Sequence, residues 1–61
     1  MSRFPALEAF ILATLAEEGE VRPPLARLAQ EWFWQSATAL QARGLVISDQ
    51  LAGVVRPKEA A

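Results

Sequence analysis

The chain contains no cysteine and no histidine, and its seven carboxylates are spread along the sequence. Without these two residue types, zinc fingers, thiol chemistry and disulfide-stapled folds are excluded. The remaining nucleophiles have no evident base partner, and the chain has no glycine-rich phosphate loop. The sequence therefore predicts no catalytic residue, no metal, no cofactor and no small-molecule substrate, and we do not expect an enzyme.

Long apolar runs are also missing. The longest charge-free apolar stretch, residues 9–16, is far shorter than the roughly 20 residues that cross a bilayer. Glu8 interrupts the apolar region that follows Arg3, and Glu17 and Glu18 stand where a secretory leader would have small residues. We therefore expect a cytoplasmic protein without membrane contact.

The residues that are present have a globular composition. Of 61 residues, 52% are hydrophobic and 21% charged, well away from the composition of disordered chains. A chain of this size buries only about 60% of the surface its unfolded form exposes, so it needs every apolar side chain or a partner's surface. The sequence predicts a single domain over residues 1–61. Its formal net charge of −1 is opposite in sign to that of most nucleic-acid-binding proteins.

Hydrophobic spacing predicts three helices, at about 6–18, 24–30 and 33–43. Gly19 and Gly44 are suited to cap the first and third helices, and the prolines after Val21 predict an extended connector in which Val21 adds a short strand. The inward residues expected on these helices are Leu7, Phe10, Ile11, Thr14 and Leu15, then Leu25, Leu28 and Ala29, then Phe33, Ala37 and Leu40.

After Gly44 the pattern changes to short β-rich runs. Residues 45–56 predict a β-hairpin with Leu45, Ile47 and one of Val54 or Val55 pointing inward, and residues 57–61 predict a frayed tail. A lone hairpin is marginal in water, so it must pack on the helices. The expected fold class is mainly α with a small β-hairpin.

The junction Ala39-Leu40-Gln41-Ala42-Arg43-Gly44-Leu45-Val46, preceded by Leu25-Ala26-Arg27-Leu28-Ala29, resembles the winged helix-turn-helix domain of bacterial and phage transcription regulators. The resemblance covers about residues 6–56 and implies three helices followed by a wing. One departure lies between the second and third helices, where Gln30-Glu31-Trp32 replaces the family's glycine-containing turn.

The resemblance implies binding of double-stranded DNA, with the third helix in the major groove and the wing on the flanking backbone. The implied contacts are Gln35, Ser36, Thr38 and Gln41 for base edges or phosphates, with Arg43, Arg27 and Arg22 as cations. A solvated helix face carries the same residue types, and so few arginines neutralise few phosphates. A DNA-binding function would therefore call for a homodimer or a second protein.

Trp32-Phe33-Trp34 is the most unusual feature of the sequence. Successive helical residues differ by about 100°, so three adjacent aromatics cannot all face one core. Either an exposed indole, with Leu12 of the first helix, forms an interface for a second copy or another protein, or both indoles wrap the edge of the core. Three functions stay open: a DNA-binding regulator, a winged-helix protein-interaction module based on Trp32, Trp34 and Leu12, and a scaffolding subunit of a larger assembly.

Overall fold

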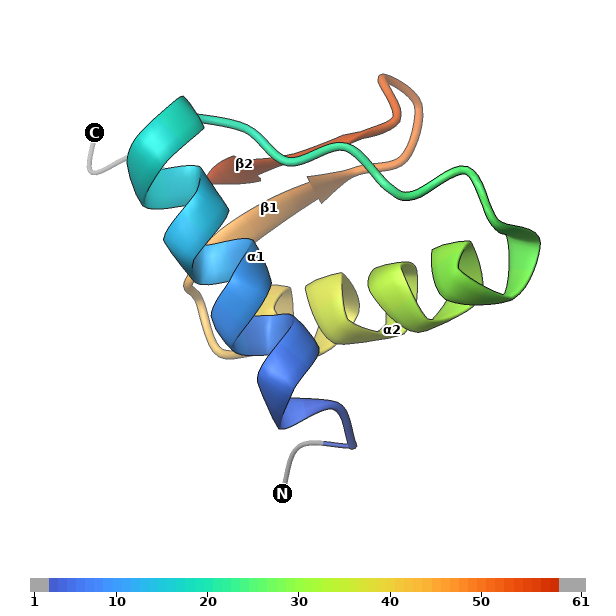
Figure 1. Cartoon of the computed structure of the whole chain (residues 1–61). Helices are drawn as coiled ribbons and strands as arrows, with labels where there is room; N and C mark the ends of the chain where they lie inside the picture. Colours follow the sequence, from blue (N-terminus) through green and yellow to red (C-terminus); the bar gives the residue numbers. More distant parts are fainter. Residues whose placement is uncertain (1–2, 59–61) are drawn as a thin grey trace.

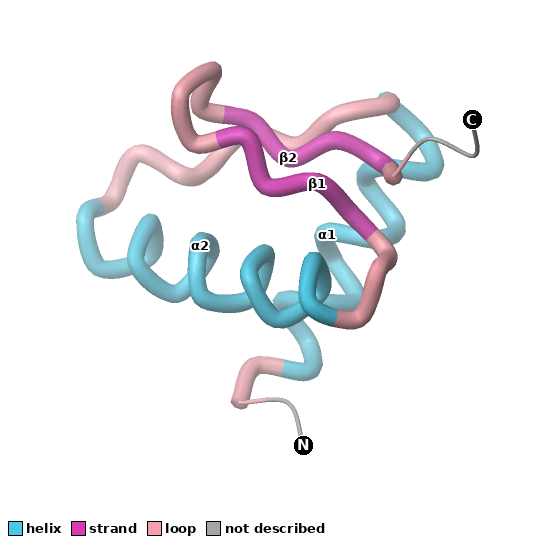
Figure 2. Tube along the Cα trace, turned by 180° about the vertical axis from the view of Figure 1, so that it is seen from behind, coloured by secondary structure: helices cyan, strands magenta, loops and turns pink. Residues whose placement is uncertain are grey.

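The computed structural model describes residues 3–58 and contains two helices followed by an antiparallel hairpin. Helix α1 spans Pro5–Glu18 and helix α2 spans Arg27–Ala42, followed by strands β1 (Val46–Asp49) and β2 (Val54–Pro57). Helix α1 crosses the C-terminal part of α2, and the hairpin covers the two helices from one side (Figures 1 and 2).

The expected number of helices is wrong. Residues 27–30 of the second helix predicted at 24–30 and residues 33–42 of the third predicted at 33–43 belong to one continuous helix, α2, and residues 24–26 remain in the connector. Residues 30–32 contain neither glycine nor proline, so nothing in the backbone interrupts the helix between Gln30 and Trp32. Of the predicted winged-helix fold, the order of helices followed by a hairpin is confirmed. The predicted helix-turn-helix is wrong, because residues 3–58 form two helices before the hairpin.

The connector between the helices is extended, as its two prolines predict. It runs from the end of α1 along the hairpin and then turns into α2 (Figure 1). Val21 forms the expected strand-like pairing: its N–H donates to the Val55 carbonyl at 2.9 Å, and the Val55 N–H donates to the Val21 carbonyl at 2.8 Å. The connector thus covers the outer edge of β2 at that point and brings Val21 into the core.

Both predicted glycine caps are confirmed. Gly19 has φ +81°, and its N–H closes α1 on the Leu15 carbonyl at 2.9 Å. Gly44 has φ +78°, and its N–H reaches the Gln41 carbonyl while the Leu45 N–H reaches the Leu40 carbonyl at 3.1 Å. This pair of bonds is a Schellman motif, which needs a left-handed residue at the position of Gly44.

The hairpin forms where the sequence predicts it, but with the opposite face of β1 inward. Val46 is buried, while Leu45 and Ile47 are partly exposed, so the expected inward pair is wrong. Side chains alternate along a strand, and a shift of one residue exchanges the two faces. On β2 both Val54 and Val55 are buried, although one of the two was expected outside.

The end of the hairpin also differs from expectation. Pro57 pairs with Val46 as the last residue of β2 rather than opening a tail. The rest of the expected tail, from residue 59 onward, lies outside the described residues.

The core lies between the two helices, the hairpin and the connector. It consists of Ile11, Leu15, Val21, Phe33, Ala37, Leu40, Val46 and Val55, with Leu7 and Trp34 packed against it. Among the residues expected inward on the predicted helices, Phe10, Leu25 and Leu28 are instead exposed. The last two are exposed because the connector swings outward before α2 begins, so the N-terminal end of α2 projects beyond the core (Figure 1).

Candidate interaction surface

The seven residues implied as DNA contacts divide into three groups. Ser36 is only 1% exposed, so its expected place on the outer face of the helix is wrong. It precedes the core residue Ala37 and lies three residues after Phe33 and four before Leu40, spacings that put it on the inward side of α2. That spacing was readable from the sequence.

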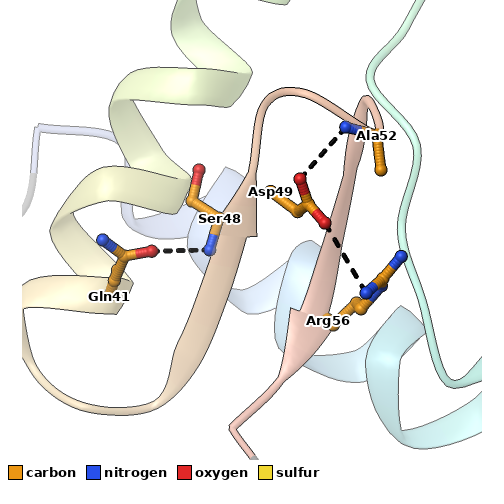
Figure 3. Close-up of polar contacts among 5 residues, drawn as sticks. All are labelled: Gln41, Ser48, Asp49, Ala52 and Arg56. Carbon is orange, nitrogen blue, oxygen red and sulfur yellow. Dashed lines mark hydrogen bonds and ion pairs between the residues drawn. The ribbon is translucent and has the colours of Figure 1, made fainter.

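Three further candidates are engaged within the chain. The Arg43 guanidinium donates to the Glu8 carboxylate at 3.3 Å, and Arg22 pairs with Glu20 at 3.5 Å. The Gln41 side-chain oxygen accepts a hydrogen bond from the Ser48 N–H at 2.6 Å, which ties the end of α2 to β1 (Figure 3). The Arg43 and Gln41 contacts join elements of the fold, whereas the Arg22 pair lies within the connector, and a nucleic acid would have to compete with all three.

The last three candidates, Arg27, Gln35 and Thr38, are exposed on α2. Their spacing places them on one side of the helix, with Glu31 between Arg27 and Gln35. Among the described residues, Arg27 takes part in none of the three ion pairs. This face therefore carries one cation, one anion and two neutral polar groups.

The two tryptophans have different environments. Trp34 is partly buried, packs on the core and meets the Phe33 ring edge-on, with centroids 5.0 Å apart. Trp32 is 43% exposed, and one side of its indole stacks on the Phe4 ring at 5.9 Å. Both interpretations from the sequence thus apply in part, since Trp34 wraps the core while Trp32 presents apolar surface to solvent.

Leu28 extends the exposed apolar area around Trp32. It is 57% exposed and lies one helical turn before Trp32 on the same side of α2. We call Phe4, Leu28 and Trp32 the Trp32 surface. Helical spacing predicts Leu28 in the core, and Phe4 is not among the predicted interface residues. In the sequence, the spacing of four residues between Leu28 and Trp32 is the signal that indicates a shared side of one helix.

Leu12, the third predicted interface residue, is 37% exposed on α1. Its angular position on α1 is about 200° from that of Phe10, so these two exposed residues lie on opposite flanks of the helix. No ring contact or hydrogen bond that the structure gives within residues 3–58 joins Leu12 to Trp32. We therefore keep Leu12 outside the Trp32 surface.

The chemistry available to this surface is apolar contact flanked by charge. Within residues 3–58, no group of three His, Cys, Asp or Glu side chains gathers where a metal ion could bind. No helix in that range is long and apolar enough to cross a membrane.

Comparison with protein families, with curated proteins and with solved structures gave no match.

Proposed function

We propose that the chain is a protein-interaction module whose contact site is the Trp32 surface. The observation that carries this proposal is the exposure of Leu28 and Trp32 together on the projecting half of α2. Tryptophan is the residue type most enriched at the energetic centre of protein interfaces, because it buries a large area while its N–H still finds a partner. The stacked Phe4 ring holds one side of the indole in place and so lowers the entropy lost on binding.

The engaged state of the DNA-contact candidates supports this choice over DNA binding. Arg22, Arg43 and Arg56 each pair with a carboxylate of the chain itself. Because DNA affinity grows with the number of phosphates that a protein neutralises, a chain with three of its arginines paired and a net charge of −1 has little electrostatic affinity for a duplex.

In-cell photo-cross-linking tests the proposed function. A photoreactive phenylalanine analogue replaces Leu28 in the cell that makes the protein, and the matched control carries the same analogue at Ala16, an exposed position on α1. We expect a defined protein adduct, identified by mass spectrometry, from position 28 and none from position 16. Absence of an adduct at position 28, or equal labelling from both positions, would overturn the proposal.

Duplex DNA is the second candidate ligand, favoured by a specific observation. The polar face of α2 that carries Arg27, Gln35 and Thr38 is exposed, and a helix of this kind followed directly by a hairpin is the arrangement of the family the sequence resembles. Glutamine pairs bidentately with adenine in the major groove, and one such pair contributes about 1–3 kcal/mol of discrimination. In this alternative, Gln35 is the base-reading residue.

Titration against mixed duplex DNA at low and at physiological salt distinguishes this alternative. Gln35→Glu puts a negative charge on the polar face, and Ala16→Glu puts the same charge on α1. If the chain reads DNA, Gln35→Glu should weaken binding about tenfold or more while Ala16→Glu has a small effect. No binding at low salt, or equal effects of the two variants, would rule the alternative out. Arg43→Glu is unsuitable for this purpose, because it would place a second carboxylate beside Glu8.

A further inference from the structure

We propose that the partner of the Trp32 surface is a second copy of this chain, with the N-terminal halves of the two α2 helices packed antiparallel around a twofold axis near Gln30. This inference rests on the proposed function and adds the identity and orientation of the partner. Its basis is that this half-helix matches a second copy of itself running in the opposite direction. Apolar residues then meet apolar residues, and each charged residue meets one of opposite charge.

Leu28 and Trp32 would supply the apolar contacts of this pair. Both lie on the same side of α2, both are about half exposed, and they stand two residues before and two residues after Gln30. A twofold axis at Gln30 therefore places Leu28 of each copy on the partner's Trp32. This contact joins a flat indole and a branched aliphatic side chain, and it occurs twice because such an interface is isologous.

The charged part concerns Arg27 and Glu31. They are one turn apart, they flank the Leu28–Trp32 stripe on the same side, and both are exposed. Neither belongs to any of the ion pairs found among the described residues. In an antiparallel twofold pair each flank meets the same flank of the other helix, so Arg27 faces the partner's Glu31 and Glu31 faces the partner's Arg27.

The same residues favour this arrangement over the parallel one. With the twofold axis along the helices, each flank would meet the opposite flank of the partner, so Arg27 and Glu31 of one copy would lie across the interface from those of the other and form no charge pair with them. The antiparallel arrangement is thus the one in which charge and apolar contacts agree. It also suits the size of the chain, because a domain this small gains the most from surface supplied by a partner.

Charge exchange between the copies gives a direct test by analytical ultracentrifugation. Arg27→Glu leaves two glutamates on the flank, and Glu31→Arg leaves two arginines, so each single variant should dimerise about tenfold more weakly than the wild type at low salt. An equimolar mixture of the two variants should recover association as a heterodimer, because every reversed contact is then between opposite charges. Circular dichroism of each variant checks that the fold is retained.

The mixture separates contacts between copies from contacts within one helix. Arg27 and Glu31 are also neighbours in their own helix, and the double variant Arg27→Glu, Glu31→Arg restores both kinds of pair. Only a contact between copies lets two defective single variants repair each other. If the mixture associates no better than the single variants, the antiparallel pairing is wrong.

The outcomes for this inference and for the proposed function are distinct. A cross-linked product of twice the chain mass from position 28, together with recovery in the mixture, supports both. An adduct to a different protein, with the chain monomeric in the ultracentrifuge, overturns the self-pairing and leaves the proposed function standing. No adduct of either kind overturns both.

Discussion

Arg43 shows how a single residue can be assigned the wrong role when only its sequence neighbours are known. It follows α2 and precedes a glycine, where a cation suits the negative end of the helix and, in the winged-helix family, suits a phosphate. The structure instead places it against Glu8, whose side chain is only 8% exposed, while that of Arg43 remains 62% exposed. A nearly buried carboxylate needs compensation for lost hydration, so this pair ties α1 to the end of α2.

A prediction follows for the stability of the fold. Arg43→Met keeps much of the aliphatic stem but removes the charge beside Glu8, and we expect it to lower the free energy of unfolding by about 1–3 kcal/mol. Arg56→Met is the matched control, because its pair with Asp49 at 3.5 Å is more exposed and should contribute only about 0.5 kcal/mol or less. Urea denaturation followed by circular dichroism gives both values. Equal losses in the two variants would contradict the role assigned to Arg43.

At the scale of elements, the continuity of α2 is the main departure from the family pattern. The turn between two helices of a helix-turn-helix requires a residue that leaves helical geometry, and glycine commonly supplies it. Gln30, Glu31 and Trp32 all accept helical geometry, and the hydrogen bond from the Gln30 N–H to the Ala26 carbonyl at 2.9 Å is already in place at the start of α2. The helix therefore continues through the predicted turn.

Substitution of Glu31 tests this continuity. In the middle of a continuous helix, Glu31→Gly should be about 1 kcal/mol less stable than Glu31→Ala, because glycine loses more backbone freedom on folding. Both variants remove the same charge, so the difference between them reports the backbone alone. If a turn interrupted the helix at this position, glycine would be tolerated as well as alanine or better. Chemical denaturation below the concentration at which copies associate is the appropriate measurement.

At the scale of the whole molecule, the small size of the chain limits its core, and the exposed half of α2 offers apolar surface that a second copy could bury. The core is built from a few side chains of four segments, and the projecting N-terminal half of α2 contributes apolar surface that residues 3–58 leave partly exposed. A folded dimer would cover that surface and raise the apparent stability by mass action.

The melting temperature should therefore depend on protein concentration. Between about 10 µM and 1 mM we expect it to rise by a few degrees, since about 1 kcal/mol shifts a domain of this size by roughly 4–8 °C. Trp32→Ala should remove the dependence, whereas Leu51→Ala, at the fully exposed tip of the hairpin, should keep it. Scanning calorimetry over this range is the check, and a melting temperature that stays constant for the wild type would contradict self-association.

Much of the local structure followed from the sequence alone, because its determinants are local. Gly19 and Gly44 end the helices because few other residues accept positive φ without strain, and the prolines keep the connector extended. The change of hydrophobic period after Gly44 located the hairpin, and Val21, expected to add a short strand, pairs with Val55 as a single β-bridge. Phe33, Ala37 and Leu40 were correctly placed in the core by their helical spacing.

The features that only the tertiary structure decided are those that depend on distant parts of the chain. The absence of glycine and proline at residues 30–32 allows the helix to continue but does not by itself require it, since Gln, Glu and Trp also occur in turns. Which face of β1 points inward depends on the Schellman turn at Gly44 and on the partner strand, so a shift of one residue exchanged Ile47 for Val46. Likewise, Trp32 is exposed and Trp34 is packed because α1 and the hairpin lie on different sides of α2, an arrangement that long-range contacts determine.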